Sequence, residues 1–468
     1  MSTQSQQGTP DAERLRAPVH PDAYGTGGTG SEALEARPTL TAREEQRALT
    51  ANLMEQVCEP KNLIRAFRRV RRNKGTPGVD GMTVRALADW LREHHATLTA
   101  SLRNGSYQPK PVRGVEIPKP GGGKRQLGIP CVVDRLVQQA ILQVLEPILD
   151  PTFSDSSFGF RPGRSAHQAL EQARKYANSG REVVVDLDLE KFFDRVNHDI
   201  LMSRLARRIG DKHLLLTVRR FLSAGMMQNG VCTEREEGTP QGGPLSPLLA
   251  NLLLDDLDRE LQRRGHCFCR YADDCNIYVR SQAAGERVMA SVVRFLEEKL
   301  RLRVNREKSA VARVGERKFL GHKILLNGKL GIAPKSLKRA QERIREITRR
   351  NRGVSFAQVI DEVTVFLNGW LLYYRLAVFR GDLIRMEEWL RRKLRCLRLR
   401  QCKRGRSVAR LLRQLGVFPQ QAARLASSGK GWWRMALSPQ ANQAMSRDWF
   451  CSQGLIDLVA KYDELHYD

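Results

Sequence analysis

Two acidic clusters are the residues of this chain best suited to do chemistry. Asp186 and Asp188 lie at the end of the apolar run EVVVDLDLEKFF, and Asp273 and Asp274 lie between apolar residues in FCRYADDCNIYV. Neighbouring carboxylates in turns between apolar strands repel one another, and a divalent cation relieves that repulsion. We therefore predict one metal centre built from both clusters, rather than two ordinary acidic turns.

Carboxylates from separate segments are what nucleotidyl transfer requires, because they hold two Mg²⁺ ions roughly 3.5–4 Å apart. One ion activates a primer 3′-hydroxyl and the other neutralises the triphosphate, so no protein nucleophile is needed. Asp186 and Asp188 are rivals for the first ligand, because alternate residues of a strand share a face. His198 lies nearby in RVNHD, and we interpret it as structural rather than as a general acid.

The charge of the chain indicates a polyanionic partner. Lys and Arg number 79 against 51 Asp and Glu, which gives a net charge of +28. The excess is concentrated between Lys335 and Arg410. A solvated basic face is the simpler alternative, but solubility alone does not require so one-sided a bias. We therefore predict that the chain binds nucleic acid.

Other patterns argue against several classes of protein. The sequence has no run of about 18 apolar residues and no apolar stretch typical of a signal peptide near its start, so we expect a cytoplasmic protein without membrane contact. The nine cysteines form no CxxC pair, whereas zinc sites usually contain closely spaced ligand pairs. The GGGK segment lacks the GxxxxGK[ST] pattern of a phosphate-binding loop.

The elements that position the acidic clusters follow from hydrophobic periodicity. VRGVEIPKPGGGKRQLGIP predicts two strands joined by a Gly-rich turn, and DRLVQQAILQVLEPIL predicts an amphipathic helix. The first acidic cluster ends a buried strand, and the second lies in a tight hairpin. From residue 335 onward the pattern is almost wholly helical, with an apolar stripe that includes Trp389 and Leu394.

The order of these motifs resembles that of reverse transcriptases encoded by mobile group II introns. YADD resembles their catalytic hairpin, and DLEKFFD resembles the strand that supplies their first metal ligand. The resemblance makes Asp188, Asp273 and Asp274 the catalytic metal ligands, with Asp188 preferred to Asp186 because of its spacing to the gate aromatic. That aromatic is Phe193, which would lie beneath the incoming sugar and favour dNTP over NTP.

The resemblance also supplies contacts for the incoming nucleotide. GTPQGGPLSPLLAN resembles the PQG motif of the family, which would bring Gln241 to the nucleotide. Arg113, Lys119 and Arg125 match the basic residues that clamp the triphosphate. Physically, cations on a hairpin offset the charge of the triphosphate and close over the substrate.

Further motifs indicate where nucleic acid binds. FGFRPGRSAHQAL matches a motif near the template groove, FLGH closes the palm, and NGWLLYYRLA resembles the signature of the maturase thumb, domain X. In that signature we expect Trp370, Tyr373 and Tyr374 to be core residues. The candidate nucleic-acid-binding residues are Arg161, Arg164, Lys308, Arg391, Arg392, Arg395 and Arg398.

The resemblance implies a right-hand polymerase of the α/β (α+β) class. Its fingers and antiparallel palm sheet would precede an all-α basic thumb. The expected segments are a disordered tail, the fingers and palm with an N-terminal extension, the thumb (domain X) and a short C-terminal nucleic-acid-binding region, over residues 1–45, 46–330, 331–410 and 411–468. The segment GKGWWRM resembles the bacterial class C subgroup, and no histidine lies between His322 and His466, so we expect no HNH nuclease.

The implied function is RNA-directed DNA synthesis with two Mg²⁺ ions, for which Mn²⁺ is an alternative, together with maturase activity. The implied partners are a group II intron RNA, an RNA template with a DNA primer, and a DNA target, in a bacterial cytoplasmic ribonucleoprotein. Two other functions stay open. One is an intron-independent reverse transcriptase of the defence or retron-like kind, and the other is an RNA-binding splicing factor without polymerase activity.

Overall fold

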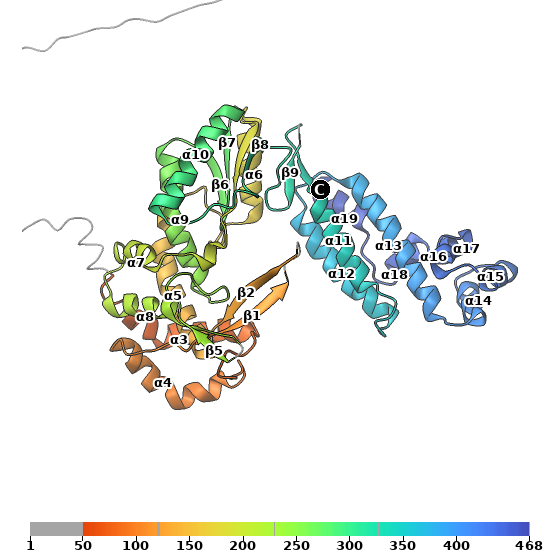
Figure 1. Ribbon diagram of the computed structural model, residues 1–468. Helices are drawn as coiled ribbons and strands as arrows, with labels where there is room; N and C mark the ends of the chain where they lie inside the picture. Colours follow the sequence, from red (N-terminus) through yellow and green to blue (C-terminus); the bar gives the residue numbers. More distant parts are fainter. Residues whose placement is uncertain (1–49, 119–121, 229, 326, 468) are drawn as a thin grey trace, which may run out of the picture.

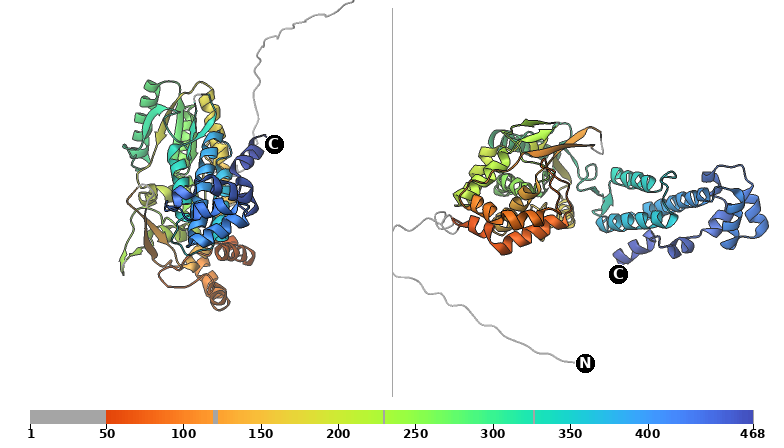
Figure 2. Two further views of the ribbon diagram at one scale, coloured as in Figure 1. Left: turned by 90° about the vertical axis from the view of Figure 1, so that its right-hand side faces the viewer. Right: turned by 90° about the horizontal axis from the view of Figure 1, so that it is seen from below.

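The chain folds into a mixed α/β body and a helical body that extends from it (Figures 1 and 2). The computed structural model describes residues 50–118, 122–228, 230–325 and 327–467. The predicted tail, residues 1–45, and Lys119 lie outside the described residues. No helix in the described part of the chain is long and apolar enough to cross a membrane.

The fingers form the lower part of the mixed body in Figure 1. Their central helix α5 buries Leu136, Val137, Ala140 and Ile141 completely, and it packs against α2 and α3. A sheet of order β2-β1-β4-β5 contains the antiparallel hairpin predicted at the Gly-rich turn. The fingers elements are α2 (Leu53–Cys58), α3 (Pro60–Arg72), α4 (Leu87–Arg103), β1 (Val112–Pro118), β2 (Lys124–Ile129), α5 (Val132–Leu149), β4 (Met226–Gln228) and β5 (Val231–Thr233).

The palm is an antiparallel sheet of order β6-β7-β3-β8, covered on both faces. In β3, Val183, Val185 and Leu187 join the core shared with α9 and α10, whereas Val184 joins the core shared with α6. A strand buried on both faces is apolar throughout rather than alternating, which explains the run EVVVDL. The palm elements are α6 (Ala166–Asn178), β3 (Val183–Leu187), α9 (Ser246–Arg263), β6 (Cys267–Tyr271), β7 (Asp274–Val279), α10 (Gln282–Lys299) and β8 (Ala310–Arg313).

Short elements connect the fingers with the palm and the palm with the helical body. Two 3₁₀ turns and two helices link the palm motifs, and a two-stranded antiparallel ribbon precedes the helical body. They are η1 (Asp150–Thr152), η2 (Phe192–Asp194), α7 (His198–Ala206), α8 (Lys212–Ser223), β9 (His322–Ile324) and β10 (Leu330–Ile332).

The thumb is the helical body, and its core includes the C-terminal residues. Buried residues of its long helices share one cluster with Phe450, Leu458 and Tyr462. The C-terminal region therefore packs as part of the thumb, because helices this short are not stable without tertiary packing. The thumb elements are α11 (Pro334–Ile347), α12 (Phe356–Tyr373), α13 (Arg380–Gln401), α14 (Gly405–Gln414), α15 (Pro419–Ala426), α16 (Trp432–Met435), α17 (Pro439–Ala444), α18 (Arg447–Ser452) and α19 (Leu458–Tyr467).

The predicted aromatic stripe of the thumb forms the joint with the palm. Tyr374 is buried, with its ring centroid 4.8 Å from that of His322 and 5.1 Å from that of Trp370. The Tyr373 hydroxyl donates to the Leu320 carbonyl at 3.0 Å. The FLGH motif therefore closes the palm by receiving the tyrosines of NGWLLYYRLA. Tyr374 is a core residue as predicted and the half-buried Trp370 packs against the core, but Tyr373 is 37% exposed and is not the core residue predicted.

Candidate active site

The three predicted catalytic carboxylates lie at the ends of two adjacent strands at the centre of the palm sheet. Asp188 follows β3, Asp274 begins β7, and Asp273 lies in the turn between β6 and β7. Because Leu187 pairs with Cys275, the register brings Asp188 and Asp274 opposite each other at the end of the ladder. The topology thus brings the two acidic clusters of the sequence together.

These carboxylates destabilise one another in their ionised forms. Burial and, after it, the charges of Asp273, Asp186 and Asp188 raise the pKa of Asp274 from 3.8 to about 6. Burial also raises the pKa of Asp273, and the charge of Asp188 adds to this effect. A cluster of this kind concentrates negative charge that bound cations would neutralise.

Two cations in the described part of the chain already contact the acidic residues. The Arg317 guanidinium pairs with Asp186 at 2.7 Å, and the Lys308 ammonium lies 3.3 Å from Asp188 Oδ2. Each of the two rivals for the first metal ligand, Asp186 and Asp188, thus has a cation beside it, and the pair with Arg317 is the shorter. Lys308 was predicted to bind nucleic acid, but it lies at the catalytic carboxylates.

The donor set suits a hard divalent cation. Carboxylate oxygens are the ligands that Mg²⁺ prefers, and Asp188 Oδ2 is buried without a hydrogen bond from any described residue. Within the described ranges, however, no three His, Cys, Asp or Glu side chains already converge as a metal-binding group. A cation would therefore compete with Lys308 for Asp188.

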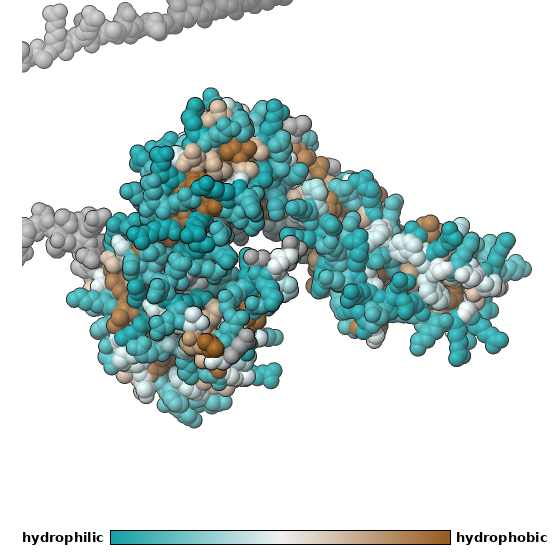
Figure 3. Space-filling view, in the orientation of Figure 1, coloured by the Kyte–Doolittle hydropathy of each residue, from teal (hydrophilic) through white to brown (hydrophobic). Residues whose placement is uncertain are grey.

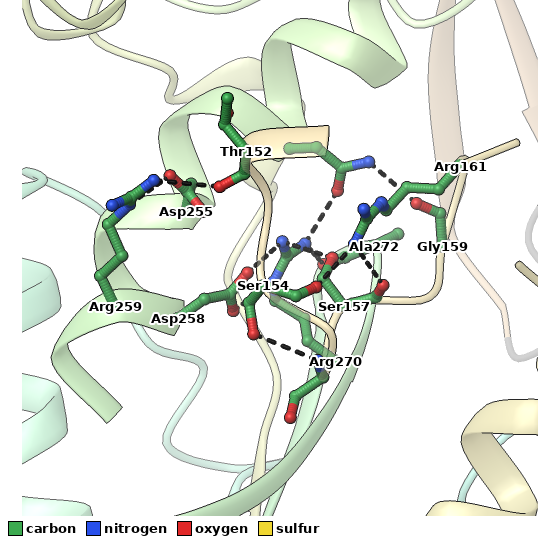
Figure 4. A network of polar contacts seen from close by, with 12 residues as sticks. Thr152, Ser154, Ser157, Gly159, Arg161, Asp255, Asp258, Arg259, Arg270 and Ala272 are labelled. Carbon is green, nitrogen blue, oxygen red and sulfur yellow. Dashed lines mark hydrogen bonds and ion pairs between the residues drawn. The ribbon is translucent and has the colours of Figure 1, made fainter. Parts of the chain in front are cut away.

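A fully buried arginine fixes the turn that carries Asp273 (Figure 4). All five N–H groups of Arg270 are used: two reach Asp258 at 2.7 and 2.6 Å, and single bonds reach Asn251, Ser157 and the Ala272 carbonyl. Neither Arg270 nor Asp258 exposes any side-chain surface. We call these five residues the Arg270 network, and it connects the catalytic turn with helix α9.

The turn itself has an unusual backbone. Ala272 has a φ of 58°, in the left-handed region that costs a residue with a β-carbon about 1–2 kcal/mol. A β-carbon on Gly159 would lie 2.3 Å from the Ala272 nitrogen, so this position requires glycine. The motif FGFRPGR therefore packs directly against the backbone of the YADD turn.

Arg161 does not bind phosphate as predicted, because its guanidinium has no free donor. Its five N–H groups reach the carboxylate and carbonyl of Asp150 and the carbonyls of Ser154 and Ser157. Only 4% of its side chain is exposed. Arg164 pairs with Asp155 and remains partly exposed, so its phosphate contact stays a prediction.

A cavity of about 580 Å³ includes Phe193 and Gln241 in its wall, together with Phe160, which follows the Gly159 that abuts the YADD turn. The Gly128 amide donates to the Gln241 carbonyl at 3.1 Å, which fastens the PQG loop to strand β2. The Thr239 amide donates to the Phe193 carbonyl at 2.7 Å. Both predicted nucleotide contacts thus line one space. Figure 3 shows a hollow between the mixed α/β body and the helical body.

His198 is structural in this arrangement. It is 2% exposed, and its Nε2 lies 2.6 Å from the Gly238 carbonyl, next to the PQG motif. Burial lowers its pKa. The ring therefore fixes the loop that carries Gln241.

The predicted triphosphate clamp lies on the β1–β2 hairpin. Arg113 is on β1 and Arg125 is on β2. Arg113 Nε is buried without a hydrogen bond from described residues. The charge of Arg125 lowers the pKa of Asp273, although burial and Asp188 outweigh it. The positive charge of Arg125 therefore acts on Asp273, one of the predicted catalytic carboxylates.

The four predicted thumb arginines differ in what they can bind. Arg395 is 7% exposed, donates to the Met445 carbonyl at 2.9 Å and packs on Phe450. Its burial lowers its pKa to about 10, so it is a core residue and not the RNA contact predicted. Arg391 is mostly buried and pairs with Glu387 at 3.1 Å.

The other two thumb arginines lie on aromatic rings. The Arg392 guanidinium is 4.1 Å from the ring centroid of Trp433, and that of Arg398 is 5.7 Å from Phe356. Their RNA contacts stay predictions. Sequence reasoning also missed Arg270, Asp258 and Arg317, whose only local signal was proximity to the YADD and FLGH motifs.

Comparisons with known proteins agree with this arrangement. Residues 117–324 match the family model "Reverse transcriptase (RNA-dependent DNA polymerase)", and residues 337–416 match "Group II intron, maturase-specific domain". Protein YkfC of Escherichia coli K12 is 33% identical over 314 residues, which cover 58% of this chain and 82% of that protein.

Further matches are more partial. The group II intron-encoded protein LtrA of Lactococcus lactis subsp. cremoris is 34% identical over 48% of this chain, but the match spans only 38% of LtrA. A chain of a Cas6-RT-Cas1–Cas2 complex is 28% identical over 53% of this chain and 27% of its own length, with a TM-score of 0.35. With both family models matched in order and most of YkfC covered, the chain belongs to the group II intron reverse transcriptase and maturase family and contains an RNA-directed DNA polymerase domain.

Proposed function

We propose that this chain copies RNA into DNA at Asp188, Asp273 and Asp274. The observation that carries the proposal is the meeting of these carboxylates at the ends of β3 and β7. The cavity lined by Phe193 and Gln241 would receive the nucleotide. Two bound divalent cations, Mg²⁺ or Mn²⁺, would activate the primer hydroxyl and neutralise the triphosphate.

The residues of the chain orient the reactants. Phe193 would crowd a 2′-hydroxyl and select dNTP, and Gln241 would contact the nucleotide from the PQG loop. Arg113 and Arg125 would offset the triphosphate charge from the β1–β2 hairpin. The Arg270 network would hold the catalytic turn while the reactants align, because small displacements in such sites cost much of the rate.

Primer extension on an RNA template tests the polymerase. The variant Asp273→Asn plus Asp274→Asn keeps the shape of both side chains and removes their charge, so we expect at least about a thousandfold loss of rate. Asp199→Asn is the matched control, because Asp199 is an exposed carboxylate paired with Arg219 on α8. If the wild type extends no primer, or the double variant extends it normally, the assignment of this site is wrong.

We also propose that the thumb binds group II intron RNA. Support comes from a cavity of about 640 Å³ between α11, α13 and α16, which we call the thumb cleft. Its described lining contains Trp389 and Trp433 and no carboxylate. The cations that line it are Arg345, Arg349, Arg350, Lys393 and Arg400.

The thumb cleft has the chemistry of an RNA site. Unpaired cations repel one another, and a phosphate backbone removes that repulsion. Exposed tryptophans stack on unpaired bases. Splicing of a cognate intron at low Mg²⁺, with and without the protein, tests the maturase role, and failure on every candidate intron would favour an intron-independent enzyme.

The finer assignments are part of the same proposal. LtrA is named a group II intron-encoded protein, which supports splicing and retrohoming into a DNA target. The class C assignment, without an HNH nuclease, rests on the likeness of the segment around GKGWWRM. A DNA cleavage assay with the intron ribonucleoprotein would detect second-strand cutting and would contradict that assignment.

A further inference from the structure

Phe160 combines two features that folding does not explain. Its φ is 57°, in the left-handed region where a bulky side chain is an outlier. Its side chain is 52% exposed, so it contributes little to the core. Strained residues of this kind persist where the surrounding structure imposes them, and they cluster at ligand sites.

The residue before Phe160 is fixed in place. The Asn251 side chain donates to the Gly159 carbonyl at 2.9 Å, and the Phe158 amide donates to the Arg270 carbonyl at 2.9 Å. Gly159 also abuts the Ala272 nitrogen so closely that no β-carbon fits. The Arg270 network therefore determines the direction in which Phe160 leaves the palm.

Phe160 leaves the palm into the cavity that contains Phe193 and Gln241. Its ring centroid lies 6.5 Å from that of Tyr271, the first residue of YADD. The cavity, of about 580 Å³, is large enough for a nucleotide. An exposed aromatic ring in such a place is a surface on which a base can stack.

Across the cavity lies a second group that indicates an anionic ligand. Arg69 and Arg135, on α3 and α5, line the same space. The Arg135 guanidinium donates to the Thr76 carbonyl at 2.7 Å, its Nε is buried without a hydrogen bond from described residues, and burial lowers its pKa. A phosphate would supply the missing acceptor.

Two sets of cations distinguish the nucleotides that this space could receive. The proposed triphosphate clamp, Arg113 and Arg125, lies on the β1–β2 hairpin. Arg69 and Arg135 lie on α3 and α5, outside that hairpin, and they line the cavity together with Phe160. A nucleotide with its base on Phe160 and its phosphate at Arg135 is therefore in the template strand.

We infer that Phe160 stacks on the templating nucleotide and that Arg135 contacts its phosphate. This inference rests on the proposed polymerase function, because the template is the ligand of that site. The strained backbone at Phe160 keeps the ring in the cavity before the template arrives.

Photo-crosslinking tests the contact without requiring catalysis. An RNA template with 5-iodouridine at the templating position is annealed to a primer, bound in EDTA and irradiated, and the modified peptide is mapped by mass spectrometry. We expect the crosslink at Phe160, and none when 5-iodouridine lies several pairs back in the duplex. A crosslink that maps elsewhere, or an equal yield with Phe160→Ala, would overturn the inference.

Substitution separates stacking from folding. Phe160→Gly relieves the left-handed backbone, so we expect its Tm to equal or exceed that of the wild type, while kcat/KM for extension falls about tenfold. Phe160→Trp retains a stacking ring and should stay near wild-type activity. Phe418→Ala is the matched control, because Phe418 is 68% exposed but lies in the thumb.

The outcomes distinguish this inference from the proposed function. A wild type that extends primers alongside an equally active Phe160→Gly variant leaves the polymerase intact and refutes the role of Phe160. A clear drop in the Tm of Phe160→Gly would mean that the ring is a core residue instead. If the wild type crosslinks at Phe160 but extends nothing, the template contact stands and the polymerase proposal fails.

Discussion

Arginine has opposite roles in the palm and in the thumb cleft. In the palm, Arg161 and Arg270 use all their N–H groups within the chain and are almost or fully buried. In the thumb cleft, Arg349 and Arg350 are exposed, and no carboxylate lines the described cavity. Buried, saturated arginines position other groups, whereas exposed, unmatched arginines are available to a ligand. Composition shows the excess of positive charge but not this division.

The largest stability effect should come from Arg270. Arg270→Met leaves the carboxylate of Asp258 buried and unpaired, so we expect a loss of about 3–5 kcal/mol in the free energy of unfolding. Urea denaturation measures it. A loss below about 1 kcal/mol would show that water or a neighbouring group replaces the guanidinium. In that case the buried arginines of the palm would not differ in structural role from the exposed arginines of the thumb cleft.

The double variant Arg270→Met plus Asp258→Leu sharpens this result. Replacing both charges with apolar groups removes the unpaired carboxylate, so most of the stability should return. The Ala272 carbonyl still lacks its donor, so primer extension should remain about tenfold slow. Recovery of stability and rate together would mean that Arg270 is needed for folding alone.

The thumb should respond in affinity and not in stability. Trp433→Ala removes a half-exposed ring, and we expect about a tenfold loss of affinity for single-stranded RNA with an unchanged Tm. Arg349→Ala should lower the slope of log affinity against log salt by about one. Filter binding across salt concentrations measures both.

The control for the thumb lies on α11, the helix that ends two residues before Arg349. Arg343 is exposed on α11 but pairs with Glu346 at 2.8 Å, so Arg343→Ala should change the salt slope less than Arg349→Ala. Equal slopes for the two variants would mean that the thumb cleft has no special place in RNA binding. In that case the excess of positive charge would attract RNA over the whole thumb surface, without a particular site.

Local patterns in the sequence were sufficient for the catalytic hairpin and for β3. Apolar runs that end in carboxylates depend on neighbours in sequence, so their strands and the pairing of Asp188 with the YADD turn could be predicted. Arg161 was misassigned, because the three carbonyls that saturate it come from a loop whose path the sequence does not show.

The same limit explains the misassigned Arg395 and the missed Arg270. The Met445 carbonyl that receives Arg395 is 50 residues away, and the apolar stripe of α13 gave no sign that this arginine faces the core. Arg270 was missed because Asp258 and Asn251 lie on a helix whose orientation to β6 is a tertiary property. Arg161 and Arg395 were predicted as binders because the carbonyls that receive them cannot be identified from the sequence.

The last prediction concerns the pH dependence of a buried carboxylate of the fingers. Asp134 is 2% exposed, and burial raises its pKa from 3.8 to about 6, although the Tyr107 hydroxyl donates to it at 2.6 Å. The folded chain therefore binds this proton more tightly than the unfolded chain does. The contribution of Asp134 to stability is complete below about pH 4 and is lost as the pH rises through 6.

Asp134→Asn isolates this titration, because the amide carries no charge at any of these pH values. Between pH 4 and pH 7, the free energy of unfolding of the wild type should fall by about 2 kcal/mol relative to the variant. Urea denaturation of both proteins at several pH values measures the difference. Parallel curves would mean that Asp134 keeps its ordinary pKa, and that the mixed α/β body tolerates a buried charge as readily as the thumb tolerates its exposed ones.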